Sequence, residues 1–321
     1  MMGLLVGAPV AMAQQAGPQR SSDPTPPDPA NATKPADPNN LPTATMAPVT
    51  VTGTRPSDDF APPAPSLNRL GATDVHDVPQ SVVIINKALM QSQGATSLTS
   101  AVRNVPGITI GAAEGGQIGN NININGFSAR TDLFVDGMRD RGQYYRDTFA
   151  LEQIEVLMGP SSMLFGRGST GGVINQVLKK PSLKAASEIT GAVTSNGLVR
   201  STIDVNLPTS EHAAFRGNAM IQKGNASTRG QTDLFDFGFA PSYRMGIGTP
   251  TEITLYALVQ RNNDQADYGL PPVNGWPANV NRNNAYGFSD DRTLQNILTV
   301  GATVDHRFSK DLALRNQTQF N

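Results

Sequence analysis

The pattern of apolar and polar positions divides the chain into three kinds of sequence. Residues 14–45 hold eight prolines among Ser, Thr, Asn and Asp, a composition that stays extended because it cannot bury a core. Residues 74–181 mix short apolar runs with one helix-like stretch, which is typical of a compact α+β domain. From residue 186 onward, segments of about ten residues alternate apolar and polar positions, which predicts antiparallel strands.

The mixed segment contains both helix and strand signals. We expect a strand over residues 78–86 and a helix over residues 87–104, interrupted near Gly94 and stopped by Pro106 and Gly107. Short apolar runs predict further strands at 121–127, 132–137, 153–159 and 171–180.

The last segment predicts seven strands, at 187–195, 198–207, 212–223, 233–245, 251–262, 294–308 and 311–320. Connections at 208–211, 246–250 and 309–310 are short, those at 224–232 and 263–293 are long, and only the tight Asn196-Gly197 connection departs from this alternation. Short turns on one side and long loops on the other are typical of an outer-membrane barrel. A soluble β-sandwich has strands at the same spacing, so this segment alone leaves both folds open.

Composition narrows the classes of function. The formal charge of -1 gives no reason to expect a polyanionic partner, so nucleic acid is excluded. The absence of cysteine excludes disulfides and thiol nucleophiles. His76, His212 and His306 are isolated without metal-ligand spacing, and no serine-hydrolase motif occurs, so we assign no catalytic residue and no metal site.

The start of the chain indicates export. Residues 1–13 are mostly apolar and end in Ala11-Met12-Ala13, a small-x-small cleavage pattern that predicts a signal peptide. The usual basic start is missing, which a start codon assigned too late would explain; a buried strand or a frayed terminus is the alternative. No apolar stretch reaches the roughly 18 residues of a membrane helix, so a membrane role requires strands.

One glycine motif raises the question of nucleotide binding. Gly166, Gly168 and Gly171 have the spacing G-x-G-x-x-G, but Gly171 opens a Val- and Ile-rich strand rather than a helix. We therefore interpret the glycines as positions that allow left-handed turns and close backbone packing against a neighbouring wall.

Several of these segments together resemble a known family. VPQSVVIINKALMQSQGATSLTSAVRNVPGI, NININGF and FVDGMRDRGQYYRDTFALEQIEVLMGPSSMLFGRGSTGGVINQVLKKP resemble, in family order, the plug domain of TonB-dependent siderophore receptors. The resemblance covers residues 46–181 and continues more weakly to the end of the chain. The loop at 263–288 is similar to catecholate receptors of the Fiu type within that family.

The resemblance implies a bacterial outer-membrane receptor rather than an enzyme. Its fold would be an α+β plug domain followed by an antiparallel transmembrane β-barrel of about 22 strands in the family. We expect no cofactor, since iron would arrive only as a ferric siderophore, and we expect a monomer. Seven strands cannot close such a barrel, so we expect the chain to be an N-terminal fragment, with residues 186–321 a partial barrel.

The resemblance also implies an energy-coupling partner. Residues 46–56 would hold the TonB box, which adds as a strand to TonB of the ExbB/ExbD inner-membrane complex. As a bare pattern this β-prone run is a weak signal. The expected partner-binding residues are Ala47, Pro48, Val49, Thr50, Val51 and Thr52.

Two positions depart from the family pattern. Many members have arginine where this chain has Asn125 and Met158, and these arginines are often described as pairing plug to barrel. That pairing cannot be carried over, which leaves open how this plug is held.

Ferric catecholates are anions with planar rings, so a site for them requires guanidinium groups and aromatic faces together. The expected ligand-binding residues lie in two stretches: Arg139, Arg141, Tyr144, Tyr145 and Arg146 in the first, and Tyr268, Trp276 and Tyr286 in the long loop. For the first stretch the alternative is a solvated turn in which Asp140 and Asp147 neutralise the arginines. For the loop it is local packing or an interfacial aromatic girdle.

The predicted function is that of a TonB-dependent outer-membrane receptor for ferric catecholate siderophores. The alternatives are a receptor for a different siderophore, a non-transporting remnant of such a receptor, or a secreted β-rich enzyme or adhesin. The last would explain export and strands but not the ordered plug motifs.

Overall fold

The computed structural model describes residues 60, 66, 78, 80–111, 121–165, 170–225, 233–284 and 286–321. The predicted signal peptide, tether and TonB box, as well as Gly166 and Gly168, lie outside the described residues.

The first domain is built on a five-stranded sheet. Its strand order is β1-β7-β8-β5-β6, and all neighbours pair antiparallel except β5 and β8, which pair parallel. The strands are β1 (Val82–Asn86), β5 (Leu133–Val135), β6 (Met138–Arg139), β7 (Leu151–Met158) and β8 (Gly172–Leu178).

Two short helices follow β1, as the interrupted helix pattern predicted. Helix α1 (Lys87–Ser92) is capped by Asn86, whose side chain accepts from the amide of Leu89 at 2.9 Å. Gly94 has a φ of +61°, which ends the helical path, and Ser97 then caps α2 (Leu98–Val102) in a capping box with Ser100. A local break in the sequence therefore produces two helices in place of one.

The remaining elements of the domain are small. A three-stranded sheet contains β2 (Ile108–Ile110), β3 (Ile122–Ile124) and β4 (Phe127–Ser128), and helix α3 (Ser162–Phe165) follows β7. Asn125 and Gly126 join β3 to β4 with positive φ angles of 51° and 83°, as a two-residue type I′ hairpin turn requires.

An apolar core fills the space between these elements. Its fully buried side chains come from α2 and from both sheets: Leu98, Val102, Ile122, Ile124, Ile154, Val156 and Ile174. The first domain thus has the usual arrangement of a folded unit in water, with apolar side chains inside.

The packing around Gly171 shows why one position of the G-x-G-x-x-G motif is a glycine. A Cβ at Gly171 would lie 2.3 Å from the carbonyl oxygen of Ile124, and one at Gly172 would lie 2.2 Å from that of Leu157. The close packing that we predicted is present, but at Gly171 the neighbour is the β3–β4 hairpin of the same domain rather than a barrel wall.

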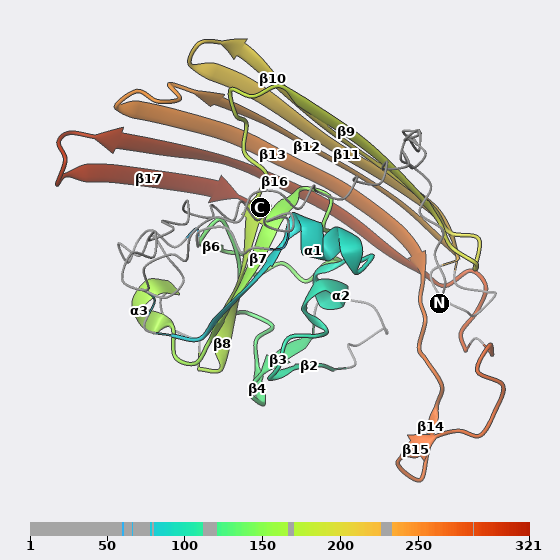
Figure 1. The fold of residues 1–321 in the computed structure, drawn as a ribbon. Helices are drawn as coiled ribbons and strands as arrows, with labels where there is room; N and C mark the ends of the chain where they lie inside the picture. The colour runs from blue at the N-terminus through green and yellow to red at the C-terminus, as the bar shows by residue number, and fades with distance from the viewer. Residues whose placement is uncertain are drawn as a thin grey trace, which may run out of the picture. The chain divides into compact units, whose positions relative to one another are not determined.

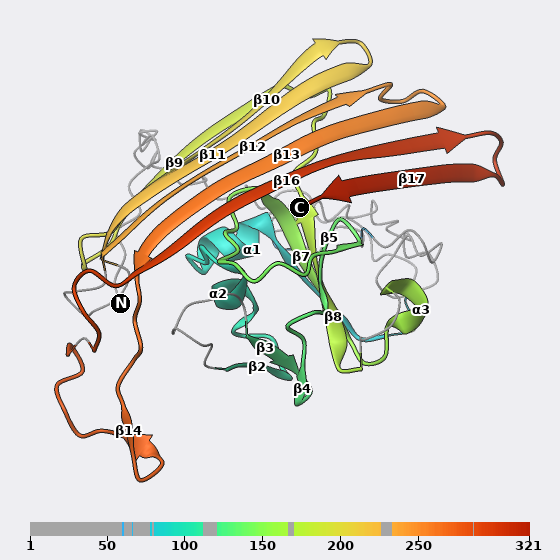
Figure 2. The same ribbon diagram turned by 180° about the vertical axis from the view of Figure 1, so that it is seen from behind.

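The second part of the described chain is one continuous antiparallel sheet in the order β17-β16-β13-β12-β11-β10-β9 (Figures 1 and 2). Its strands are β9 (Ala186–Val193), β10 (Val199–Ser210), β11 (Ala213–Asn225), β12 (Asp233–Met245), β13 (Thr251–Gln265), β16 (Arg292–Arg307) and β17 (Ala313–Phe320). The seven predicted strands are confirmed, and β10 and β13 each end three residues later than predicted.

The connections alternate as the sequence suggested. Because neighbouring strands are antiparallel, the turns at 211–212, 246–250 and 308–312 lie at one end of the sheet. The turn at 194–198 and the long connection between β13 and β16 lie at the other end, where β11 also ends and β12 begins. The longer connection carries a hairpin of β14 (Pro272–Val273) and β15 (Trp276–Pro277), which extends away from the end of β13 (Figure 1).

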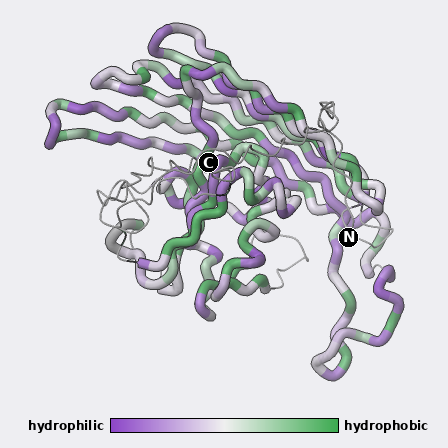
Figure 3. Tube along the Cα trace, viewed as in Figure 1, coloured by the Kyte–Doolittle hydropathy of each residue, from purple (hydrophilic) through white to green (hydrophobic). Residues whose placement is uncertain are grey.

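The two faces of the sheet have opposite polarity. One lateral row is apolar on six successive strands, and all but its alanine are large and exposed: Ile189, Ile203, Ala219, Phe239, Val259 and Leu298. The other face carries buried polar side chains that lie toward the first domain, including Asp204, Asn218, Gln260 and Thr299. Figure 3 shows hydrophilic and hydrophobic residues following one another along these strands.

This polarity decides between the two folds that the sequence left open. A soluble sandwich buries its apolar face against a second sheet, whereas this sheet exposes the apolar face and buries the polar one. A strand sheet with an apolar exterior and a polar interior is the wall of a membrane barrel. Among the helices of the described residues, none is long and apolar enough to span a membrane.

Candidate functional site between the first domain and the strand sheet

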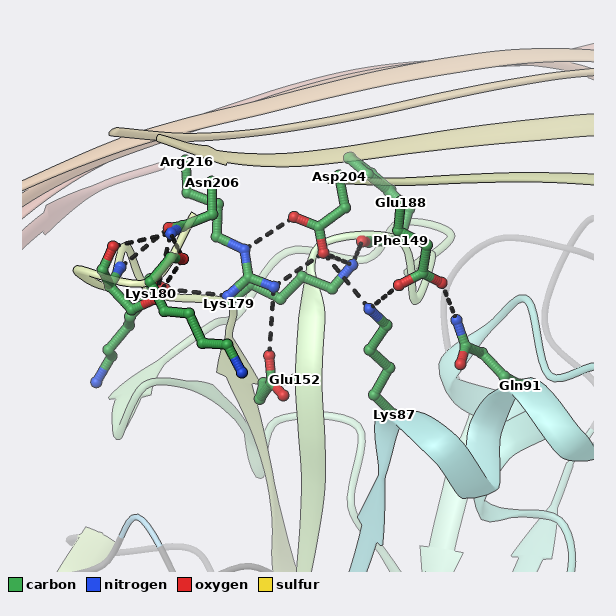
Figure 4. Close-up of polar contacts among 12 residues, drawn as sticks. Lys87, Gln91, Phe149, Glu152, Lys179, Lys180, Glu188, Asp204, Asn206 and Arg216 are labelled. Carbon is green, nitrogen blue, oxygen red and sulfur yellow. Dashed lines mark hydrogen bonds and ion pairs between the residues drawn. The ribbon is translucent and has the colours of Figure 1, made fainter. Parts of the chain in front are cut away.

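The first domain is attached to the sheet by a cluster of ion pairs around Asp204 of β10 (Figure 4). The Asp204 carboxylate lies 3.6 Å from Lys87 Nζ, 3.1 Å from Lys179 Nζ and 2.8 Å from the guanidinium of Arg216. Lys87 begins α1 and Lys179 follows β8, so two cations of the first domain share one carboxylate of the sheet.

Two further acids balance the charge of this cluster. Lys87 Nζ lies 2.5 Å from Glu188 of β9, whose other oxygen accepts from Gln91 at 2.7 Å. Arg216 Nη2 lies 3.7 Å from Glu152 of β7. We call these six charged residues the Asp204 cluster: Lys87, Glu152, Lys179, Glu188, Asp204 and Arg216.

Because Lys179 is buried, its positive charge depends on the nearby carboxylate of Asp204. The Lys179 side chain is only 7% exposed, and removal from water lowers the pKa of its ammonium group. Its Nζ also donates to the carbonyl oxygen of Phe149 at 2.8 Å. A buried lysine in this position is held in its charged form by the carboxylate beside it.

A second attachment joins the loop before β7 to β10. Arg200 of β10 donates to both oxygens of Asp147, at 2.6 and 2.8 Å, and both side chains are buried. Arg200 is also the first member of a polar row across neighbouring strands, in which Gln222 accepts from Arg200 at 2.7 Å and donates to Asp236 at 2.6 Å. The members are directly opposed in register: Arg200, Gln222, Asp236, Asn262 and Gln295.

The loop before β7 is also bound near the far end of the polar row, through the main chain of Tyr145. Gln295 accepts from the amide of Tyr145 at 2.9 Å, and Gln260 donates to the carbonyl oxygen of Tyr145 at 2.7 Å. Removal of its ring from water raises the pKa of the Tyr145 phenol. These hydrogen bonds attach the main chain of the first domain at Tyr145 to the strand sheet.

The structure brings some of the predicted ligand residues together. Arg146 lies over the ring of Tyr144, with the guanidinium carbon 4.1 Å from the ring centroid. It also donates to Asp140 at 2.8 and 3.1 Å and to the carbonyl oxygen of Gly142 at 2.6 Å. Tyr144 donates to Asp140 at 2.6 Å.

These contacts correct the picture of a solvated turn. Arg146 and Asp140 are each only 2% exposed, so their ion pair is internal to the domain, and Asp147 pairs with Arg200 of the sheet rather than with an arginine of its own loop. The guanidinium of Arg146 is already occupied in this structure. Ligand contact by this stretch stays a prediction.

The other predicted residues of this stretch are more accessible. Arg139 lies 5.2 Å over Phe134 and 3.7 Å from Asp132, with its side chain partly exposed. Arg141 is exposed. Arg141 is therefore the guanidinium of this stretch most open to solvent.

The predicted aromatic residues of the long loop lie in the connection between β13 and β16, far in sequence from these arginines. Trp276, in the β14–β15 hairpin, is 77% exposed; Tyr268 is also exposed, and Tyr286 is half-buried. Gly287 packs against the ring of Tyr268, where a Cβ would lie 3.3 Å from the ring. Of the three predicted aromatic residues of this loop, Tyr268 and Trp276 therefore lie at the surface.

A cavity of about 400 Å³ lies between α1 and strands β9 and β10. Its walls include charged members of the Asp204 cluster and apolar side chains such as Met90 and Phe149. Across the described ranges, no group of three or more His, Cys, Asp or Glu side chains is arranged to hold a metal ion.

The two positions that depart from the family pattern are in contact with each other. Asn125 Nδ2 lies 4.0 Å from Met158 Sδ, a neutral contact inside the first domain. The ion pairs that hold the domain are instead those of the Asp204 cluster and of Asp147 with Arg200. Apart from Asp147, these residues were not predicted from the sequence; for Asp204, Arg200 and Arg216 the available signal was charge within the alternating strand pattern.

The fold and the interface define a class: a small α+β domain held by ion pairs against the polar face of a membrane β-sheet. Comparison with known families agrees with this class, since residues 74–173 match the model described as TonB-dependent Receptor Plug Domain.

Individual proteins show the same relationship. The chain is 38% identical over 219 residues to the probable TonB-dependent receptor BfrD of Bordetella pertussis, covering 66% of this chain and 30% of BfrD. It is 30% identical over 266 residues to the catecholate siderophore receptor Fiu of Escherichia coli K12, covering 77% of this chain and 35% of Fiu.

Solved structures extend the similarity to the fold. The siderophore receptor PiuA of Acinetobacter baumannii matches with a TM-score of 0.73 and 30% identity, over 76% of this chain and 36% of that one. The open form of Fiu from E. coli K12 also gives 0.73, with 28% identity, over 81% and 41%.

Residues 74–173 are therefore a plug domain of the TonB-dependent receptors, and the chain resembles receptors of the Fiu type. It spans about a third of the length of the curated relatives named here. The first domain is a receptor plug, and the seven strands form part of an outer-membrane barrel. The relatives are receptors, and no enzyme is among those named.

Proposed function

We propose that this chain is the plug-bearing part of a TonB-dependent outer-membrane receptor that imports ferric siderophores, with catecholates as the substrate class. The observation that carries the proposal is the plug held by buried ion pairs on the polar face of a membrane sheet. A plug in that place closes a barrel lumen until it is displaced. Support for catecholates comes from the similarity to Fiu and from the predicted ligand residues.

The ligand would contact guanidinium and aromatic groups on the side of the long connections. We propose Arg141 and Arg139 of the plug loop, with Tyr144 and Tyr145, as one part of the site. The exposed Trp276, with Tyr268 and Tyr286, would form the other part, contributed by the loop. Arg146 would hold the plug loop in place through Asp140, because its guanidinium is buried and paired.

Energy would enter through TonB, acting with ExbB and ExbD on the predicted box at Ala47–Thr52. The receptor would act as a monomer, since barrel closure uses strand edges within one chain. Iron would remain bound to its siderophore throughout, so no resident cofactor is needed.

Iron uptake in cells that lack their own siderophore receptors tests this proposal. The whole gene that contains this sequence is expressed there, and uptake of radioactive iron is measured with a ferric catecholate and with a ferric hydroxamate. We expect uptake of the catecholate only, and its loss when residues 47–52 are deleted. Hydroxamate uptake alone would favour a different siderophore class, and no uptake of either would favour a non-transporting protein.

Single substitutions test the site. We expect Arg141→Ala and Trp276→Ala to weaken ferric catecholate binding by about tenfold each, since a cationic or aromatic contact to an anionic ring is lost. Lys310→Ala, in the turn at the opposite end of the sheet, is the matched control and should bind as the unchanged chain does. Equal binding by all three variants would place the ligand elsewhere.

A further inference from the structure

The centre of the plug sheet holds a buried carboxylate that belongs neither to the Asp204 cluster nor to the Asp147–Arg200 pair. Glu155 lies in β7, between β1 and β8, and has no exposed surface. Within the described ranges it forms no ion pair. Neutral donors satisfy its two oxygens.

Half of those donors come from a single residue far away in sequence. The amide of Ser66 donates to Glu155 Oε1 at 2.5 Å, and its hydroxyl donates to Oε2 at 2.8 Å. The other two donors belong to the plug sheet itself: Gln153 Nε2 at 2.6 Å from Oε1 and Asn175 Nδ2 at 2.9 Å from Oε2. Asn175 also lies 3.2 Å from the Ser66 hydroxyl.

Ser66 occupies a specific place in the chain. It lies between the predicted TonB box at residues 46–56 and the first plug strand, which begins at Val82. A pull on the box reaches Ser66 before it reaches β1, because the chain runs in that order.

We propose that Glu155 anchors the TonB-box segment to the plug, and that release of Ser66 from this carboxylate is an early step when the segment is pulled. This inference rests on the proposed function for the pull itself. The contact itself is present in the structure.

The consequence of release follows from the burial of Glu155. Without Ser66, the carboxylate keeps only the donors Gln153 and Asn175, yet it stays inside the sheet. A buried charge that loses hydrogen bonds is destabilised, and Glu155 faces Asn175 across the β7–β8 pair. Loss of one external contact would thus weaken the pairing at the centre of the plug.

The uncharged isostere Glu155→Gln should break this contact. Each carboxylate oxygen accepts from at least one N–H donor, Ser66 N and Gln153 at Oε1 and Asn175 at Oε2, so the amide nitrogen of a glutamine would face an N–H donor in either orientation. The matched control is Glu211→Gln, which removes the same charge from an exposed turn between β10 and β11.

Hydrogen exchange of the chain in detergent tests the contact directly. We expect exchange of the Ser66 amide to rise by about tenfold in Glu155→Gln and to stay unchanged in Glu211→Gln. If Glu155→Gln does not fold, Ser66→Ala serves instead, since it removes the hydroxyl donor without altering a strand; we expect a rise of about threefold in the same peptide. Unchanged exchange in the variant that folds would overturn the proposal.

Binding of the isolated periplasmic domain of TonB separates the anchor from a purely structural role. We expect this domain to bind Glu155→Gln several times more tightly than the unchanged chain in the absence of siderophore, because the box segment is no longer tied down. Equal binding would make Glu155 a stabiliser of the sheet only and would overturn the anchor. If the domain binds neither form while exchange still rises, the proposed function fails and the Ser66–Glu155 contact stands.

Discussion

The plug and the strand sheet place their apolar side chains on opposite sides. In the plug, residues such as Ile154 and Ile174 are fully buried between the sheet and the helices. In the strand sheet, Phe239 and Leu298 are 47% and 52% exposed, while Asp236 and Gln260 are almost fully buried. The two parts of one chain are built for different surroundings, the plug for water and the outer face of the sheet for lipid.

This difference explains why ion pairs and amide hydrogen bonds make up much of the interface, beside one small apolar cluster of Phe149, Ala150, Met220 and Ala240. The face that the sheet turns toward the plug is polar, so the plug attaches through charged and amide groups such as Asp204 and Arg200. Such attachments can be exchanged for water when the plug moves, whereas an apolar interface would expose its whole area. An interface of this kind suits a domain that has to be displaced.

The largest expected effect comes from reversing the polarity of the plug interior. Ile154→Asp places a carboxylate where no partner exists, and we expect a loss of about 4 kcal/mol in the free energy of plug unfolding. Thermal unfolding of the chain in detergent, followed by near-UV circular dichroism, measures the change. Ile154→Val is the control and should cost about 1 kcal/mol. An unchanged transition in Ile154→Asp would mean that the plug core is open to water.

The next effect concerns the Asp204 cluster. Asp204→Asn leaves Lys179 buried without its carboxylate, and we expect a cost of about 3 kcal/mol. Protease sensitivity of the plug measures this change, because detachment from the sheet exposes its loops. Asp305→Asn removes one partner of an exposed pair with Arg315, which are 3.4 Å apart, and should cost less than about 1 kcal/mol. Similar costs for both variants would contradict the role given to burial.

A smaller effect tests the lipid face. Phe239→Lys puts a charge on the outward face, and we expect a loss of about 2 kcal/mol in lipid vesicles. Phe239→Leu, which stays apolar, should change stability by less than about 1 kcal/mol. If the lysine variant were as stable in vesicles as the leucine variant, this face would not meet hydrocarbon.

The smallest effect concerns a buried acid of the plug. Burial raises the pKa of Asp132 above its value of 3.8 in an unfolded chain, and Arg139 only partly offsets this rise. A carboxyl group whose pKa is higher in the folded state loses stability as pH rises from the unfolded pKa through the folded one. We therefore expect Asp132→Asn to gain up to about 1 kcal/mol at neutral pH, and to lose this advantage below about pH 4. Melting temperatures of both forms across this pH range check the prediction, and a constant difference would contradict it.

The sequence by itself determined the local elements. The period-two pattern over residues 233–245 predicted β12 with the bounds that the structure has, and Gly94 marked the break between α1 and α2. The ordered plug motifs indicated the family, and the family model matches the same region. These features are readable because backbone periods and turn conformations act between residues close in sequence.

Only the tertiary structure decided how the parts are joined. Asp147 and Arg200 are separated by 53 positions, and Ser66 and Glu155 by 89, so no local pattern could pair them. Alternation along the strands fixed two faces, but which face meets lipid and which meets the plug depended on where the plug lies. From the sequence, Arg146 was predicted to bind the ligand, whereas the structure buries it in an ion pair with Asp140. Ion-pair partners are chosen by the docking of folded elements, because charge acts across space rather than along the chain.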